Sequence, residues 1–194
     1  TEAVHLNITV LAEEFGFTDT ASYTQIRLEG KEIETIDAGT FKNLPVLRDL
    51  RLESNQIRLL APFTFNNLSR LEVLRLSGNQ IYKIAPFTFD NSASLQSLAL
   101  DANQLSAVDP AAFNALPALR ELNLSRNAIQ SVSQYSFKTL IALKTLDLSY
   151  NSIAVVEATT LKGLAKLEWL DLSHNRIYSV ASGAVADFSL KCFS

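Results

Sequence analysis

An asparagine recurs every 24 residues along this 194-residue chain, and no other feature of the sequence constrains the fold as strongly. Three leucine columns, meaning residues at the same position of successive repeats, follow the same step without an insertion. The asparagines are Asn55, Asn79, Asn103, Asn127, Asn151 and Asn175. The leucine columns run from Leu47 to Leu167, from Leu50 to Leu170 and from Leu52 to Leu172. A degenerate earlier copy begins at Tyr23 and has Lys31 where the asparagine is expected. Self-similarity at a fixed period predicts a stack of similar structural units.

Within each repeat, the leucines alternate with variable residues, as in Leu74-Arg75-Leu76. Alternation places Leu74 and Leu76 inward and Arg75 outward on a short strand. The return segment, for example "APFTFNNL", contains proline and short polar residues and favours turns or short 3-10 segments. Because the return side is wider than the strand side, the stack should curve. We therefore predict an α/β-type repeat solenoid with a parallel β-sheet on its concave face.

The asparagine and phenylalanine columns have structural interpretations. A buried amide is costly unless its hydrogen bonds are satisfied, and it offers both donors and an acceptor. We expect each asparagine to satisfy backbone groups where the chain leaves its strand. The phenylalanines should stack as a spine of rings on the return side that fades to Leu161 and Val185. They are Phe41, Phe65, Phe89, Phe113 and Phe137.

The segments "LRDLRLESNQI", "LEVLRLSGNQI" and "LKTLDLSYNSI" resemble the leucine-rich repeat motif L-x-x-L-x-L-x-x-N-x-I/L. The repeat length and the phenylalanine column resemble the typical 24-residue subclass. That subclass is common in extracellular animal proteins such as Toll-type receptor ectodomains, Slit proteins and insect leucine-rich immune proteins. The resemblance implies an array of about seven repeats over residues 23–190. It also implies an extracellular module of innate immunity or cell-surface recognition.

The two ends of a parallel stack need covering, because exposed strand edges invite unwanted pairing. Residues 1–22 should form an N-terminal capping segment, and "VHLNITVLA" is rich enough in β-formers to add an edge strand. Residues 191–194 are interpreted as the start of a truncated further repeat, one residue early. This end is expected to contact either a missing C-terminal region or a second copy of the chain. A single cysteine, Cys192, leaves the compartment open.

Composition and motifs argue against several functions. The net charge of −3 argues against a nucleic-acid binder, which usually carries a basic excess. No apolar run is long enough for a membrane helix. The sequence has no metal-ligand cluster, phosphate-binding loop or nucleophile elbow, so we predict no enzyme activity, cofactor or metal. Asp171, Ser173 and His174 are too close in sequence for the histidine to bridge the other two as a triad.

The variable positions of the concave face change character along the array. One column passes from Arg27, Arg51 and Arg75 to Asp147 and Asp171. Glu29 and Glu53 should neutralise the arginines, so the N-terminal half reads as a solvated charge ladder. Toward the C-terminus, outward aromatic and charged residues resemble an interface anchor set. The candidate ligand-binding residues are Arg126, Asp147, Tyr150, Trp169, Asp171 and His174. The alternative for Trp169 is packing against missing repeats.

Three N-glycosylation sequons begin at Asn7, Asn67 and Asn123. Such sequons also arise by chance, so their number is not evidence of secretion. Asn123 should point onto the concave face, where a glycan would obstruct a partner. The sequence thus predicts an extracellular binding module for a protein or another macromolecule. The alternative is a structural spacer or oligomerisation segment with no ligand on its concave face.

Overall fold

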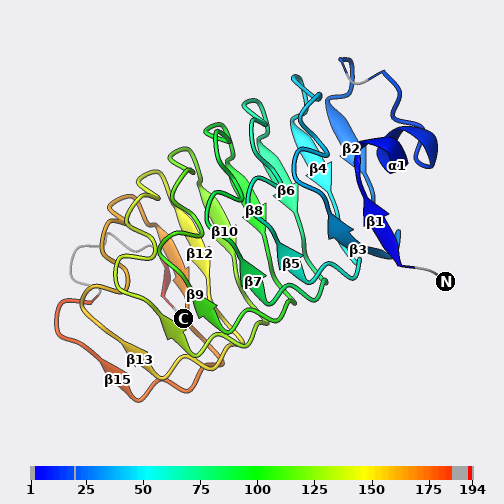
Figure 1. The fold of residues 1–194 in the computed structure, drawn as a ribbon. Helices are drawn as coiled ribbons and strands as arrows, with labels where there is room; N and C mark the ends of the chain where they lie inside the picture. Colours follow the sequence, from blue (N-terminus) through cyan, green and yellow to red (C-terminus); the bar gives the residue numbers. More distant parts are fainter. Residues whose placement is uncertain (1–2, 20, 185–191, 194) are drawn as a thin grey trace.

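Eight short parallel strands form one continuous sheet along the length of the chain (Figure 1). The computed structural model describes residues 3–19, 21–184 and 192–193. The strands are β2 (Gln25–Arg27), β4 (Asp49–Arg51), β6 (Val73–Arg75), β8 (Ser97–Ala99), β10 (Glu121–Asn123), β12 (Thr145–Asp147), β14 (Trp169–Asp171) and β16 (Cys192–Phe193). Their order in the sheet is their order in the chain, which confirms the predicted solenoid.

The register of the sheet matches the repeat, because residues one repeat apart lie opposite each other. Leu50 faces Leu74, and Leu74 faces Leu98. At the last pair, Cys192 lies opposite Trp169, one residue short of a full repeat. Inward and outward positions are as predicted: Leu74 and Leu76 are fully buried, and Arg75 is exposed.

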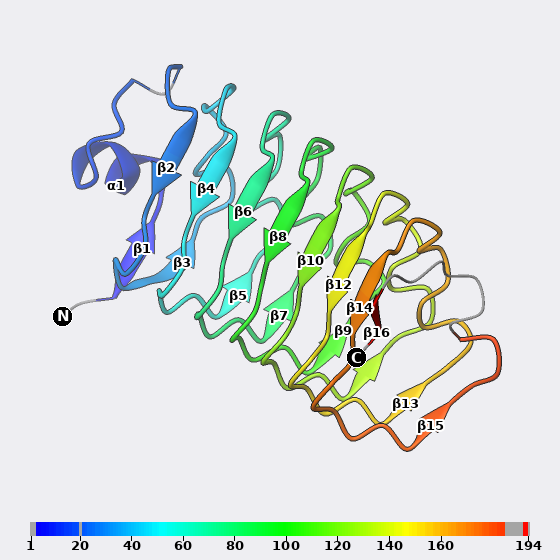
Figure 2. The same ribbon diagram turned by 180° about the vertical axis from the view of Figure 1, so that it is seen from behind.

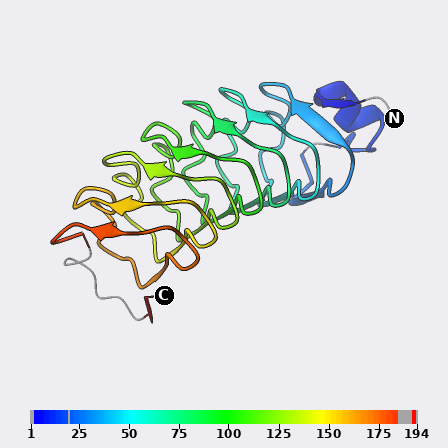
Figure 3. The same ribbon diagram turned by 90° about the horizontal axis from the view of Figure 1, so that it is seen from below.

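The other side of the stack consists of turns and seven further short strands (Figure 2). These strands are β3 (Ile33–Ile36), β5 (Leu59–Leu60), β7 (Lys83–Ile84), β9 (Ala107–Val108), β11 (Ser131–Val132), β13 (Val155–Val156) and β15 (Ser179–Val180). The last six pair only two by two, as β5–β7, β9–β11 and β13–β15. Phe41, Phe65 and Phe89 stack with ring centroids 5.9 Å apart, between this side and the leucines. Seen from below, the repeats follow one another as a single coil (Figure 3).

The N-terminal segment forms a strand over only part of "VHLNITVLA", and this strand lies outside the eight-stranded sheet. A strand forms only at β1 (Val4–Leu6), and it pairs with β3 in a separate two-stranded sheet. The chain then turns into the helix α1 (Ile8–Glu13), because the Asn7 side chain caps it. Asn7 Oδ1 accepts hydrogen bonds from Thr9 N at 2.9 Å and from Val10 N at 3.0 Å. Amide capping therefore overrides the β-propensity of these residues.

Each asparagine of the column joins the backbones of two repeats. Asn79 Oδ1 accepts from Ile57 N at 3.0 Å, and Asn79 Nδ2 donates to the carbonyls of Leu52 and Leu76 at 2.9 and 3.0 Å. All six asparagines make these same three kinds of bond. The amide thus takes the place of backbone partners at the point where the chain leaves its strand.

Replacement of Asn103 tests this role, because the residue lies in the middle of the array and is 8% exposed. Asn103→Leu keeps the side-chain size but leaves the backbone groups of Ile81 and Leu76 without their partner. We expect the free energy of unfolding to fall by about 1–3 kcal/mol. Urea titration followed by circular dichroism measures it. The neighbouring exposed change Gln104→Leu should alter stability little, and equal losses in both variants would refute the role.

Candidate ligand-binding face

A shallow hollow lies on the sheet face between β8 and β14. It is lined by outward side chains and strand backbone, including Ser97, Ala99, Thr145 and Trp169. Two small residues, Ser97 and Ala99, stand where the preceding strand β6 carries Val73 and Arg75, and this difference creates the space. Trp169 is half-buried at the end of the hollow nearest the C-terminus. This hollow is the candidate ligand site.

Strands β10, β12 and β14 make the hollow acidic on their side, while Arg75 of β6 lies opposite Ala99 at its other end. Glu121, Asp147 and Asp171 occupy outward positions of β10, β12 and β14, and no lysine or arginine occupies an outward position of β8, β10, β12 or β14. In the described part of the chain, none of the three carboxylates forms an ion pair. A cationic group placed in the hollow would therefore meet unneutralised negative charge.

The same acidic residues also hold the loops that follow their strands. Asp147 Oδ1 accepts from Ser149 N at 2.9 Å and from Ser149 Oγ at 2.7 Å. Asp171 Oδ1 accepts from Ser173 N at 2.8 Å, and Asn123 makes the corresponding bonds to Ser125. Sequence reasoning missed this role, although the recurring Asn/Asp-Leu-Ser pattern carries its signal. The bonds fix the orientation of the carboxylates before any ligand arrives.

Three of the predicted site residues form a separate stack on the loops beside the sheet. The Arg126 guanidinium carbon lies 4.4 Å from the centroid of the Tyr150 ring. The Tyr150 and His174 rings stack at 4.1 Å with an interplanar angle of 16°. All three residues have left-handed backbones, with φ between 52° and 53°, because their column repeats one loop conformation. Tyr150 thus contacts both Arg126 and His174, and 43% of the residue remains exposed.

The structure thus divides the six predicted site residues. Asp147 and Trp169 line the hollow, and Asp171 lies opposite Asp147 on the next strand. Arg126, Tyr150 and His174 do not line it. We therefore centre the candidate site on the strand residues and treat the stack as a neighbouring rigid edge.

At the other end of the face, Arg51 forms its ion pair with Asp49 on its own strand, with Nη2 and Oδ2 2.9 Å apart. The charges of Glu53 and Glu29 also favour its charged form and help to raise the pKa of Arg51, after the larger effect of Asp49. Burial raises the pKa of Asp49, but hydrogen bonds from Arg51 and Gln25 outweigh it and hold the pKa below its usual value. Burial, with help from Glu29, raises the pKa of Glu53. Its Oε2 atom is buried without a hydrogen-bond partner.

The three sequons lie in different settings. Asn7 caps α1, and Asn123 lines the hollow. Asn67 is exposed, and its Oδ1 accepts from Asn91 Nδ2 at 3.1 Å. Across the described residues, no group of three or more His, Cys, Asp or Glu side chains is arranged to hold a metal ion. No helix among those residues is long and apolar enough to span a membrane.

A solenoid of short repeats with a continuous, outward-facing sheet defines a class of binding scaffolds, in which conserved inward positions carry a variable outer face. The match to a family model is consistent with this class. The model described as "Leucine rich repeat" matches residues 23–81, 69–129 and 117–177, which together cover most of the chain. The chain belongs to the leucine-rich repeat family.

Solved structures of similar fold come from larger proteins. The leucine-rich repeat domain of APL1B is 28% identical, with a TM-score of 0.69 over 92% of this chain and 52% of that one. TLR13 in complex with ssRNA13 is 28% identical, with a TM-score of 0.78 over 84% of this chain and 23% of that one. Drosophila Toll in complex with Spatzle is 22% identical, with a TM-score of 0.83 over 89% of this chain and 23% of that one. This chain therefore spans about a quarter to a half of these proteins. Among curated proteins, no match to this chain is found.

The two perturbed carboxylates give opposite pH effects. The folded-state pKa of Glu53 is raised, so ionised Glu53 destabilises the fold at pH 7, and this cost disappears as the pH falls through that pKa. Glu53→Gln should therefore raise the melting temperature at pH 7 and raise it less near about pH 4.5. The folded-state pKa of Asp49 is lowered, so its stabilisation is lost only as the pH falls through that lowered value.

Asp49→Asn is thus the matched control. It should lower the melting temperature at pH 7 and still lower it near about pH 4.5. Differential scanning calorimetry of both variants at the two pH values measures the effects. A Glu53→Gln variant that melts below the wild type at pH 7 would contradict the assignment.

Proposed function

We propose that this chain is a non-enzymatic recognition module whose sheet face binds a protein with basic side chains at the contact. The observation that carries the proposal is the hollow between β8 and β14, which places the only tryptophan of the sequence beside unpaired carboxylates. Buried Trp side chains are among the residues that dominate binding energy at protein interfaces. The carboxylates supply the electrostatic complementarity that selects a cationic partner.

The frame around the hollow favours recognition without rearrangement. The strands beneath it are fixed by the sheet and by the asparagine amides, and the carboxylates of Asp147 and Asp171 are oriented by their own loops. A ligand would therefore meet side chains that have already lost much of their freedom, and less binding energy is spent on ordering them.

An extracellular role in immune recognition is the biological setting that we propose. The resemblance to the typical repeat subclass and the likeness to APL1B support it. Toll, which is similar in fold alone, is described as a hub of Drosophila development and innate immunity. TLR13 was solved with single-stranded RNA. The acidic face of this chain disfavours the same kind of ligand, since nucleic-acid binding depends on basic groups that neutralise phosphates.

Glycan mapping tests the free sheet face. A glycan on Asn123 would fill the hollow, so we expect the peptide that carries this residue to be unmodified when the chain is secreted from animal cells. Asn67 is exposed and serves as the internal comparison within the same molecule. Mass spectrometry of tryptic peptides before and after deglycosylation gives the answer. A glycan at Asn123 would rule out a protein partner in the hollow.

Binding measurements test the site itself. We suggest screening a panel of purified secreted and cell-surface proteins by biolayer interferometry, and then comparing three variants against each binder. Trp169→Ala should weaken binding roughly 30-fold, the equivalent of about 2 kcal/mol. Asp147→Asn should weaken it less, because it removes the charge while an amide can still hold the loop, as Asn123 does in its own repeat. Arg27→Ala, on β2 outside the hollow, should change little.

The lone tryptophan gives a second readout, because a ligand in the hollow should change the emission of Trp169. If no member of the panel binds, or if Arg27→Ala weakens binding as much as Trp169→Ala, the proposal is wrong. The first result would favour the spacer or oligomerisation role, and the second would move the site along the sheet.

A further inference from the structure

Three junctions on the return side lack strand pairing, β3–β5, β7–β9 and β11–β13. A backbone bond of 3.4 Å still crosses the first and the last, from Gly39 N to the Phe63 carbonyl and from Tyr135 N to the Thr159 carbonyl. The middle one, between the repeats of residues 71–94 and 95–118, is different. In this fully described stretch, no hydrogen bond joins residues 82–94 to residues 105–118. The preceding junction is closed by several bonds. There, Thr88 Oγ1 donates to the Leu60 carbonyl at 3.2 Å, and Ser92 Oγ donates to the Phe65 carbonyl at 2.8 Å. We call the middle junction the seam.

The sequence of the fourth repeat accounts for the seam. Ala112 stands one repeat after Thr88, so the hydroxyl that bonds across the preceding junction is absent here. Ala111 likewise follows Phe87, whose ring stacks on Phe63 with centroids 5.9 Å apart. Two alanines thus remove a hydroxyl and an aromatic ring from this junction.

The sheet side stays closed at the same junction. β6 pairs with β8, and Asn103 Oδ1 accepts from Ile81 N at 2.9 Å. The two repeats are therefore held together along the sheet and the asparagine column, while the opposite side opens between β7 and β9.

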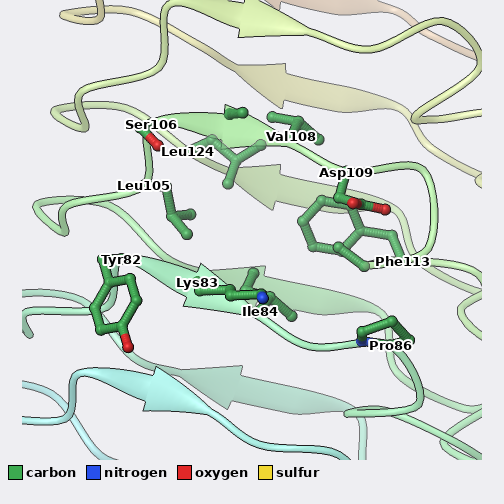
Figure 4. A pocket seen from close by; sticks show the side chains of 12 residues that line it. Tyr82, Lys83, Ile84, Pro86, Leu105, Ser106, Val108, Asp109, Phe113 and Leu124 are labelled. Carbon is green, nitrogen blue, oxygen red and sulfur yellow. The ribbon is translucent and has the colours of Figure 1, made fainter.

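A cavity of about 440 Å³ occupies the seam (Figure 4). Its apolar walls are Ile84, Leu105, Val108, Ala112, Phe113 and Leu124. Leu124 is completely buried, so the cavity reaches the core of the solenoid. Its volume lies within the range of small-molecule sites, and an apolar cavity gains from a ligand because it holds water poorly.

The mouth of the cavity is polar. Tyr82, Lys83, Ser106 and Asp109 lie there, on either side of the seam (Figure 4). In the described part of the chain, Lys83 forms no ion pair. Asp109 uses one carboxylate oxygen to accept from Ala111 N at 2.7 Å. The mouth therefore offers a free ammonium group and two hydroxyls to a head group. The Asp109 carboxylate adds a negative charge across the seam from Lys83, so an acidic head group is placed on the Lys83 side.

We propose that the seam binds a small amphipathic molecule with an aliphatic body and a carboxylate head, of the fatty-acid type. The body lies between Ile84 and Val108 and reaches toward Leu124, and the head meets the Lys83 ammonium. A protein partner fits less well, because a standard interface covers about 800 Å² per partner, whereas this site is a half-open cavity of about 440 Å³. The site is independent of the sheet face and of the function proposed for it.

Isothermal titration calorimetry with dodecanoate, kept below its micelle concentration, tests the proposal. The wild type should bind one equivalent saturably. Ala112→Thr gives this position the residue of the three preceding repeats and should weaken binding at least about tenfold while the melting temperature holds or rises. Ala107→Phe blocks the exposed rim of the cavity without touching the core and should have the same effect on binding. Ser131→Phe, one repeat further on, is the matched control and should bind as the wild type does.

The head-group assignment has its own comparison. Lys83→Gln should weaken dodecanoate several-fold and leave dodecanol unchanged, because only the carboxylate uses the ammonium. Equal binding of dodecanoate by wild type and Lys83→Gln would overturn the acidic head group. Absence of saturable binding to the wild type, or undiminished binding by both Ala112→Thr and Ala107→Phe, would overturn the site. If the Trp169 experiment shows no binding on the sheet face, the dodecanoate measurement remains a valid test of the seam.

Discussion

The rest of the structure depends on the hydrogen bonds of one buried amide per repeat. Each asparagine of the column accepts from one repeat and donates to carbonyls of two, so it sets the distance and the register between neighbouring repeats. Leucine burial alone would drive collapse but would not choose a register, since hydrophobic burial has no direction. Because the amides recur at the same position, the sheet continues through all the described repeats.

This frame leaves the two sides of the array free to differ. On the sheet face, the backbone is already fully paired, so outward side chains change without loss of the fold. On the return side, strands pair only at alternate junctions, and side chains and single hydroxyls such as those of Thr88 and Ser136 add to the closure. A change to alanine there opens a junction, as at Ala112, while the asparagine column keeps the repeats together. Both proposed binding sites follow from this asymmetry.

The candidate site also shows how one side chain serves two purposes. Asp147 and Asp171 hold the loops after their strands, yet their charge remains unpaired and faces the solvent. A carboxylate fixed in this way is ready for a cationic partner, because its orientation is set by the fold. Arg126, Tyr150 and His174, by contrast, stack against one another beside the sheet. Tyr150 nevertheless remains exposed at the edge of the face.

The sequence by itself determined the solenoid, the inward and outward positions and the column of amides, because each depends on local alternation repeated at a constant step. It also placed Trp169 on the outer face. Only the tertiary structure decided which outward residues share a site. Adjacent outward residues come from different repeats, and their side chains differ in size and in hydrogen-bond or ring partners. Pairing of Arg51 with Asp49, stacking of Tyr150 on His174 and the opening beside Ala112 each depend on such side-chain geometry. A repeating sequence predicts a repeating backbone, whereas the contacts between unlike side chains differ from one repeat to the next and do not follow from the repeat.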